Sequence, residues 1–315
     1  MKIAVVGAGG VGGYFGARLA QGGEDVHFLA RGAQLAAMRE RGLQIRSGLG
    51  DFDLAPADAH ATDNPADIGP AQVVLFTVKA YDTETAAASL PPLLGPDSVV
   101  LSLQNGIDNE EKLAARIGAE RVAGGAAYIF AGIAEPGLIR HTAGPARIVF
   151  GELDGRRTPR LEAFLAACRR AGIDAHLVDD IRVALWTKYI LICAQSGLTA
   201  ATRQPIGVVR ESPPSWNLFR QVLEEGVNVA RAEGVAVPDE LVERTLANMA
   251  GLPPNLYSSL YDDLVAGRRM EVETLQGELS RRAERAGVLA PASSALYAVL
   301  LPQAPRAGND GAPTT

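Results

Sequence analysis

The sequence predicts an α/β protein in which an N-terminal domain with a parallel sheet precedes a C-terminal domain made of helices. The chain has 315 residues, roughly twice the ~150 residues of a typical domain. Up to residue 178, short apolar segments alternate with helical stretches, which favours a parallel sheet covered on both faces. After residue 179 apolar residues recur at helical spacing. We therefore expect domains at 1–179 and 180–303, followed by a flexible tail at 304–315, which is rich in Pro, Gly and Ala.

Apolar and β-branched segments bounded by turn residues mark the expected strands of the first domain. They are Ile3–Val6, Asp25–Leu29, Val73–Val78, Ser98–Leu103, Val122–Ile129, Ala146–Phe150 and Ala175–Val178. Helical spacing of apolar residues marks the expected helices. They are Gly13–Gln21 in the first domain and Ile181–Gln195, Trp216–Glu233, Asp239–Met249 and Met270–Ala286 in the second.

The composition is that of a globular protein, with 47% hydrophobic and 21% charged residues. A net charge of −6 argues against a broad nucleic-acid-binding surface. No segment approaches the ~18 consecutive apolar residues of a membrane span, and the start lacks the features of a signal peptide. Cys168 and Cys193 lie in apolar sequence, as reduced core cysteines do. We expect a cytoplasmic protein without nucleic-acid or membrane partners, and no Cys, His or Asp spacing suggests a metal site.

Glycines immediately after the first expected strand form the motif Gly7-Ala8-Gly9-Gly10-Val11-Gly12, which also opens a helix. In this context GxGxxG is typical of a dinucleotide-binding turn. Gly7 permits the tight turn, Gly9 lets the pyrophosphate approach the backbone, and Gly12 lets helix and strand pack closely. The free N–H groups of the helix start favour phosphate. We therefore predict a Rossmann-type domain whose cofactor contacts all six residues.

Three polar residues follow the carboxyl ends of expected strands, where ligands of such sheets bind. Arg31 stands where an NAD site would usually carry an acid, and its guanidinium can pair with a 2′-phosphate, so NADP(H) is favoured over NAD(H). Lys79 is expected to meet phosphate or ribose. Asn105 can donate and accept hydrogen bonds toward a carboxamide or a carbonyl. The alternatives are a solvated arginine, a solvated lysine and an ordinary Asn-Gly turn.

Lys188 and Glu271 are the candidate catalytic pair. Lys188 precedes the apolar run Tyr189-Ile190-Leu191-Ile192-Cys193, where a charge is unfavourable unless it is paired or useful. Glu271 is expected at the start of a helix, which stabilises a carboxylate. The two could form an ion pair, although each could also be an ordinary snorkelling lysine or helix-start acid.

These segments together resemble the ketopantoate reductase family, the NADPH-dependent 2-dehydropantoate 2-reductases. The resemblance spans almost the whole chain. It is carried by the six-residue glycine motif, Arg31, Thr77-Val78-Lys79-Ala80, Gln104-Asn105-Gly106, Pro136-Gly137, Trp186-Thr187-Lys188, Ser258-Ser259, Gly267-Arg268-Arg269-Met270-Glu271 and the spacing from Gly277 to Pro291. It implies a role in pantothenate biosynthesis.

The resemblance also implies roles for individual residues. Lys188 would protonate the developing alkoxide as hydride arrives from the nicotinamide, and Glu271 would position the lysine or the cofactor. Asn105 would touch nicotinamide and substrate, and Ser259 would bind the substrate carboxylate. Ala131 is expected to contact the cofactor.

The chain departs from the family pattern in the substrate pocket. Asparagines expected one and two helical turns after the lysine are replaced by Ile192 and Ser196, of which only Ser196 can hydrogen-bond. Further expected asparagines are absent around 204–206 and at Leu256. These changes should alter the choice of substrate more than the type of reaction. Ketopantoate is the leading substrate, and another keto acid or ketone is the alternative.

Other classes of protein remain open. A different dehydrogenase with a Rossmann and a helical domain, such as a 3-hydroxyacid dehydrogenase or an imine reductase, would use another catalytic set. An NADP(H)-binding regulator without turnover would explain the missing amides. The expected site lies between the domains, as ligand sites often do, and the helical domain has enough apolar surface for a homodimer.

Overall fold

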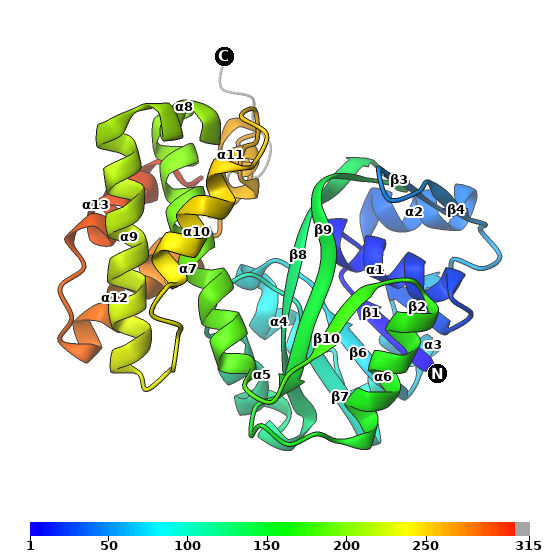
Figure 1. The fold of residues 1–315 in the computed structure, drawn as a ribbon. Helices are drawn as coiled ribbons and strands as arrows, with labels where there is room; N and C mark the ends of the chain where they lie inside the picture. The colour runs from blue at the N-terminus through cyan, green and yellow to red at the C-terminus, as the bar shows by residue number, and fades with distance from the viewer. Residues whose placement is uncertain (306–315) are drawn as a thin grey trace. The chain divides into compact units, whose positions relative to one another are not determined.

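The computed structural model describes residues 1–305, which form two compact units (Figure 1). The first comprises Met1–Gln104 and Asp108–Ala184, and the second comprises Asn105–Ile107 together with the chain from Leu185 onward. The division between them falls inside the long helix α7 (Ile181–Thr202). Almost all of the expected tail at 304–315 lies outside the described residues.

The first unit is built on a ten-stranded sheet. Its strands are β1 (Lys2–Val6), β2 (Asp25–Leu29), β3 (Leu43–Ser47), β4 (Phe52–Leu54), β5 (Ala61–Thr62), β6 (Ala71–Phe76), β7 (Leu94–Ser102), β8 (Val122–Glu135), β9 (Leu138–Glu152) and β10 (Asp174–Leu177). They lie in the order β4-β3-β9-β8-β7-β6-β1-β2-β5, and β10 pairs with β9. Within it, the run β5-β2-β1-β6-β7-β8 is parallel throughout, in the strand order of the Rossmann fold. The order reverses between β1 and β6, where this fold opens a crevice.

The predicted parallel sheet is extended by two antiparallel pairs, which were not expected. Strands β8 and β9 form a long antiparallel hairpin, and β3 and β4 are also antiparallel. The short turn Pro136-Gly137 explains the hairpin, because a tight connection can join only antiparallel neighbours. Gly137 has a φ of +84°, which glycine adopts readily. Strands β3, β4 and β5 were not expected, because they are short and rich in polar residues.

Alternate residues of the strands enter two different hydrophobic cores. On β1, Ile3 and Val5 belong to one core, which also holds Phe15 of α1 (Gly10–Gln21) and Phe164 of α6 (Pro159–Arg170). Ala4 and Val6 belong to the other core, together with residues of α3 (Pro65–Ile68), α4 (Thr83–Ala87) and α5 (Asn109–Ile117). The sheet is therefore covered on both faces, as its apolar strands predict. The helix α2 (Gly32–Arg41) follows β2.

The second unit is helical. After α7 come α8 (Ile206–Glu211), α9 (Pro213–Ala232), α10 (Leu241–Ala250), α11 (Ser259–Val265), α12 (Glu278–Ala286) and α13 (Pro291–Leu300). A π-helical turn, η4 (Glu273–Gly277), directly precedes α12. The helix expected at Met270–Ala286 therefore begins later and irregularly, and Glu271 lies just ahead of it rather than in its first turn. Within residues 1–305, no helix combines the length and apolarity needed to cross a membrane.

Candidate active site

The glycine-rich turn between β1 and α1 is fixed by contacts that exclude side chains. Gly7 has a φ of +101°, and a Cβ there would lie 2.9 Å from the backbone nitrogen of Val78. A Cβ on Gly12 would collide with the Gly7 carbonyl and the Thr77 hydroxyl. The Thr77 hydroxyl itself donates to the Gly7 carbonyl at 2.7 Å. Gly7 and Gly12 are thus needed for the ends of β1 and β6 to approach α1.

Gly9 has a different environment. A Cβ placed on it would meet no protein atom within 4 Å. It is also the N-cap of α1, where no side chain accepts a hydrogen bond from the first N–H groups of the helix. These donors and the open space beside Gly9 fit the pyrophosphate of a dinucleotide, which binds at such helix starts.

A cavity of about 250 Å³ lies at this turn. Gly7, Ala8 and Gly9 line it together with Arg31, which follows β2, and Val78, which follows β6. Arg31 is exposed, so its guanidinium is accessible to a ligand. Lys79 is half-buried beside Val78 and is the N-cap of a short 3-10 turn at Ala80–Asp82, but it does not line the cavity.

Gly10 and Ala131 pack against each other. A Cβ on Gly10 would collide with the Ala131 carbonyl oxygen and lie 2.6 Å from its carbonyl carbon. Neither of these residues, nor Val11 or Gly12, lines the cavity, whereas Ile133, two residues after Ala131 on β8, does. In this structure Gly10 lets α1 approach β8.

Gln34 on α2 connects the glycine turn to the β8–β9 hairpin, and sequence reasoning missed it. Its amide nitrogen donates to the Ala8 carbonyl at 3.0 Å, and its amide oxygen accepts from the Gly137 N–H at 2.9 Å. Gln34 also lines the cavity. Nothing in the local sequence marks this residue, because both of its partners belong to other segments of the chain.

A second amide joins the ends of β6 and β7. The buried Gln104 donates to the Val78 carbonyl at 2.9 Å and to the Thr83 hydroxyl at 2.8 Å. It therefore ties together the strand ends that carry Lys79 and Asn105. Nearby, burial raises the pKa of Glu110, at the start of α5, to about 7, against the lowering effects of its own backbone N–H and the Ser102 hydroxyl.

The second unit contains the other predicted site residues. Lys188 on α7 is only 9% exposed, and Glu271 is only 6% exposed. Asn105 also belongs to this unit, although it follows β7 in sequence. The candidate catalytic residues are therefore grouped in one unit, and the dinucleotide motif is in the other.

The two candidate serines of this unit differ in their surroundings. Ser196 is buried on α7, and its hydroxyl accepts from the Gln276 amide at 2.9 Å. Ser259 is exposed at the first position of α11. The preceding Ser258 is the buried N-cap, which accepts from the Thr199 hydroxyl at 2.8 Å and from the Tyr261 N–H at 3.2 Å. Ser259 thus keeps its side chain outside this capping network.

The helix that carries Lys188 is lined by apolar and aromatic residues. The buried ring of Trp186 meets Tyr189 edge to face, with 5.6 Å between the ring centroids. Ile192 is half-buried one helical turn after Lys188, on the same side of the helix. Burial raises the pKa of the Cys193 thiol, which keeps it protonated and unreactive.

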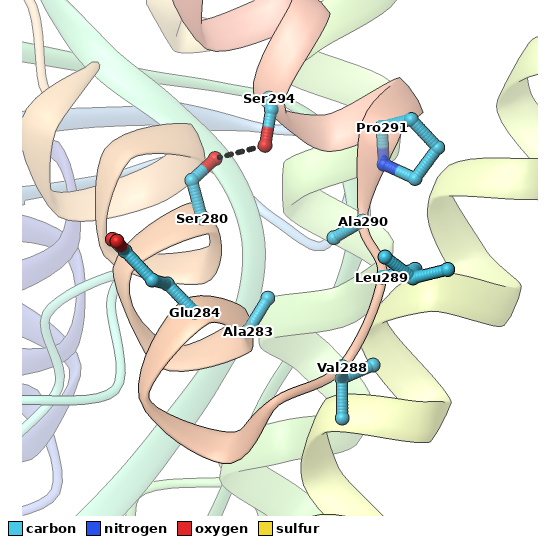
Figure 2. A pocket seen from close by; sticks show the side chains of 8 residues that line it. All are labelled: Ser280, Ala283, Glu284, Val288, Leu289, Ala290, Pro291 and Ser294. Atoms are coloured by element: carbon cyan, nitrogen blue, oxygen red, sulfur yellow. Dashed lines mark hydrogen bonds between the residues drawn. The ribbon is translucent and has the colours of Figure 1, made fainter.

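A further cavity, of about 460 Å³, lies between α12 and α13 (Figure 2). Leu289, which is 88% exposed, lines it together with Val288 and Pro291, and at one side the Ser294 hydroxyl donates to that of Ser280 at 3.4 Å. It holds none of the predicted site residues. Among residues 1–305, no group of three or more His, Cys, Asp or Glu side chains is placed to hold a metal ion.

Comparisons with known proteins match both units. The family model "Ketopantoate reductase PanE/ApbA" matches residues 3–155, and "Ketopantoate reductase PanE/ApbA C terminal" matches residues 180–303. The chain is 33% identical to the uncharacterized oxidoreductase YkpB of Bacillus subtilis, covering 95% of this chain and 98% of that one. It is 35% identical to a 2-dehydropantoate 2-reductase of Archaeoglobus fulgidus, covering 91% and 92%. The crystal structure of 2-dehydropantoate 2-reductase from Geobacter metallireducens superposes with a TM-score of 0.89 and 34% identity, covering 96% and 99%. The chain therefore belongs to the ketopantoate reductase (PanE/ApbA) family of oxidoreductases.

Proposed function

We propose that the protein reduces a 2-keto acid to a 2-hydroxy acid with NADPH, and that the substrate is 2-dehydropantoate, which would place it in pantothenate biosynthesis. The observation that carries the proposal is the burial of Lys188 on α7, a helix rich in apolar and aromatic residues. A buried ionisable side chain is a candidate for a functional role, because such groups gather at active sites. The uncapped helix start beside Gly9 supports the dinucleotide part of the proposal.

Each residue of the proposed site would have a separate role in the reduction. The cofactor, when bound, supplies a hydride to the carbonyl carbon. The Lys188 ammonium polarises the carbonyl oxygen by hydrogen bonding and then transfers a proton from its Nζ to that oxygen, yielding the hydroxyl. Glu271 orients the ammonium, Asn105 holds the carboxamide and the substrate, and the Ser259 hydroxyl donates to the substrate carboxylate. The polar tip of Lys188 thus acts within an apolar setting, which strengthens its field.

The nicotinamide cofactor is proposed to be NADP(H). Arg31 lines the cavity at the carboxyl end of β2, where an NAD site usually places an acid that binds the ribose 2′-hydroxyl. A guanidinium forms forked hydrogen bonds with phosphate, which favours the 2′-phosphate of NADP(H). Lys79 would add positive charge near the same cavity.

A less polar keto acid is the second candidate substrate. Ile192 offers no hydrogen bond one turn after Lys188, and the buried Ser196 hydroxyl, which accepts from Gln276, is a shorter polar group than the asparagine of the family pattern. A pocket that offers no hydrogen bond to a substrate hydroxyl discriminates only weakly between that substrate and an analogue without the hydroxyl. A pocket that does hydrogen-bond the hydroxyl rejects the analogue by ~10⁴-fold or more.

The test is steady-state oxidation of NADPH, with NADH as the control, on ketopantoate and on 3,3-dimethyl-2-oxobutanoate, which lacks only the hydroxyl. Rapid turnover of ketopantoate and little of its analogue would support the pantoate assignment. Comparable kcat/KM for both would favour the less polar class. Tight NADPH binding without turnover of any keto acid would contradict the enzymatic proposal and favour a regulator.

The assembly and location are part of the same proposal. We propose a cytoplasmic homodimer. The two cysteines, Cys168 and Cys193, are unpaired and buried, as expected of a protein from a reducing compartment. Light scattering of the purified protein measures the oligomeric state, and a monomer mass at micromolar concentration would contradict the dimer.

A further inference from the structure

Lys188 and Glu271 lie on segments that are far apart in sequence but are joined by buried hydrogen bonds. Both segments belong to the second unit. One is α7, and the other is the stretch that contains Glu271 and continues into the π turn η4. The bonds between them come from Tyr189 and Gln276, neither of which has a role in the proposed reaction.

Tyr189 provides the first link. It directly follows Lys188 on α7 and is only 1% exposed. Its hydroxyl donates to the Leu275 carbonyl at 2.7 Å and lies 3.4 Å from the Thr274 carbonyl. A buried hydroxyl without a partner is destabilising, so this contact fixes where the π turn can sit against α7.

Gln276 provides the second link, from the π turn back to α7. Its amide nitrogen donates to the Cys193 carbonyl at 3.1 Å and to the Ser196 hydroxyl at 2.9 Å. If the Gln276 amide were flipped, its oxygen would face the Cys193 carbonyl oxygen, and two acceptors would repel each other. The orientation of the amide is therefore determined. Gly197 makes room for it, because a Cβ there would lie 3.2 Å from the Gln276 nitrogen.

The helical irregularity coincides with these links. The Gly277 N–H bonds to the Val272 carbonyl at 2.9 Å, five residues back instead of four. Such π turns are rare, and they occur often at functional sites. Here the turn begins just after Glu271, and three of its residues contact α7 through hydrogen bonds.

We propose that Tyr189 and Gln276 are positioning residues, which hold the Glu271 segment in a fixed relation to the Lys188 helix. This inference rests on the proposed roles of Lys188 and Glu271. Tyr189 acts through the backbone of the π turn and does not touch the reacting atoms. The competing explanation is that the two residues only stabilise the helical core.

The first experiment removes one hydroxyl. Tyr189→Phe should lower kcat about tenfold, because a displacement of even ~1 Å at the reacting groups can slow a reaction ~100-fold. The KM and Kd for NADPH should stay within about twofold, since the glycine turn and Arg31 belong to the other unit. Tyr297→Phe is the matched control. It removes a hydroxyl that bonds the Glu273 carboxylate of the same π turn at 2.9 Å, but on the exposed side, and should leave kcat unchanged.

The second experiment repeats Tyr189→Phe in a Glu271→Gln background. If Tyr189 acts through Glu271, the added loss of kcat should be small, because coupled residues are not additive. Full additivity of the two losses would overturn the inference. So would a lower Tm of Tyr189→Phe with unchanged kcat, which is the result expected of a purely structural role.

A second variant and one control keep the test decisive. Should Tyr189→Phe not fold, Gln276→Met, which keeps the length of the side chain and removes its amide, should show the same separation of kcat from NADPH affinity. Lys188→Ala distinguishes a failure of the proposed function from a failure of the positioning inference. If that variant retains full activity, the proposed function fails. If it is inactive while Tyr189→Phe behaves as wild type, only the positioning inference fails.

Discussion

The proposed dinucleotide end of the first unit and the proposed catalytic end of the second unit are built by opposite means. At the glycine turn, missing side chains matter most: Gly9 leaves open space at the cavity, and Gly7 and Gly12 let β1, β6 and α1 pack closely. Near Lys188, side chains make the connections, and buried hydrogen bonds from Tyr189 and Gln276 join α7 to the π turn. The first site should therefore be sensitive to added atoms and the second to deleted atoms.

The largest effect is expected at the second site. Lys188→Ala should reduce kcat about 10³-fold, because it removes the proposed proton donor and with it the positive charge proposed to face the developing alkoxide. NADPH affinity, measured by fluorescence titration, should change less than about threefold. If instead the Kd for NADPH rises strongly while kcat at saturating NADPH stays normal, Lys188 belongs to the cofactor site. The contrast between the two ends then fails.

Adding one methyl group to the glycine turn tests the other half of the comparison. Gly9→Ala should raise the Kd for NADPH about tenfold or more without changing the Tm of the free protein, because its Cβ meets no protein atom. Gly12→Ala should lower the Tm by several degrees, because its Cβ would collide with the Gly7 carbonyl and the Thr77 hydroxyl. Equal changes in Tm for the two variants would show that the space beside Gly9 is not reserved for a ligand.

Arg31 lines the cavity beside the glycine turn. Arg31→Ala should raise the KM for NADPH about tenfold to hundredfold, since a charge-assisted hydrogen bond contributes ~1.5–3 kcal/mol. The KM for NADH, which lacks the 2′-phosphate, should stay nearly constant. A parallel rise for both cofactors would contradict the proposed contact with the 2′-phosphate.

Glu110 is expected to affect stability rather than ligand binding. Burial raises its pKa from 4.5 to about 7, so the folded state binds the proton more tightly than the unfolded state. Stability from this group is therefore complete below about pH 4.5 and decreases by up to roughly 3 kcal/mol as the pH rises through about 7. Glu110→Gln, which keeps the shape without the charge, should raise the Tm by a few degrees at pH ~8 and little at pH ~5. A gain that is equal at both pH values would exclude titration of Glu110 as its cause.

The same contrast explains what could be predicted from the sequence. Strand β2 was predicted at its observed bounds, and the α/β fold class with a helical second part was confirmed. Their signals are local, since apolar runs and a six-residue glycine motif can be recognised within one window. The long β8–β9 hairpin and the π turn were missed, because they depend on pairing between distant segments.

The candidate site shows the same limit at the level of single residues. Gln34, Gln104 and Gln276 each bridge segments through an amide, but glutamine has no sequence signature for such a role. Ser258 and Ser259 are adjacent and chemically equal, yet one is a buried cap and the other is exposed. Only the surrounding fold distinguishes them. The roles of Lys188, Glu271 and Arg31 stay predictions until the variants are measured.

The edge-to-face contact of Trp186 with Tyr189 also gives the molecule an intrinsic optical reporter. The chain has two tryptophans, and the other, Trp216, lies half-buried on α9, stacked on Phe219. Replacing Trp216 with Phe would leave a single indole, two residues from Lys188 and shielded from water. Its emission spectrum and quenching would then follow the environment of that helix alone, so ligand-dependent changes there could be recorded in real time without any attached dye.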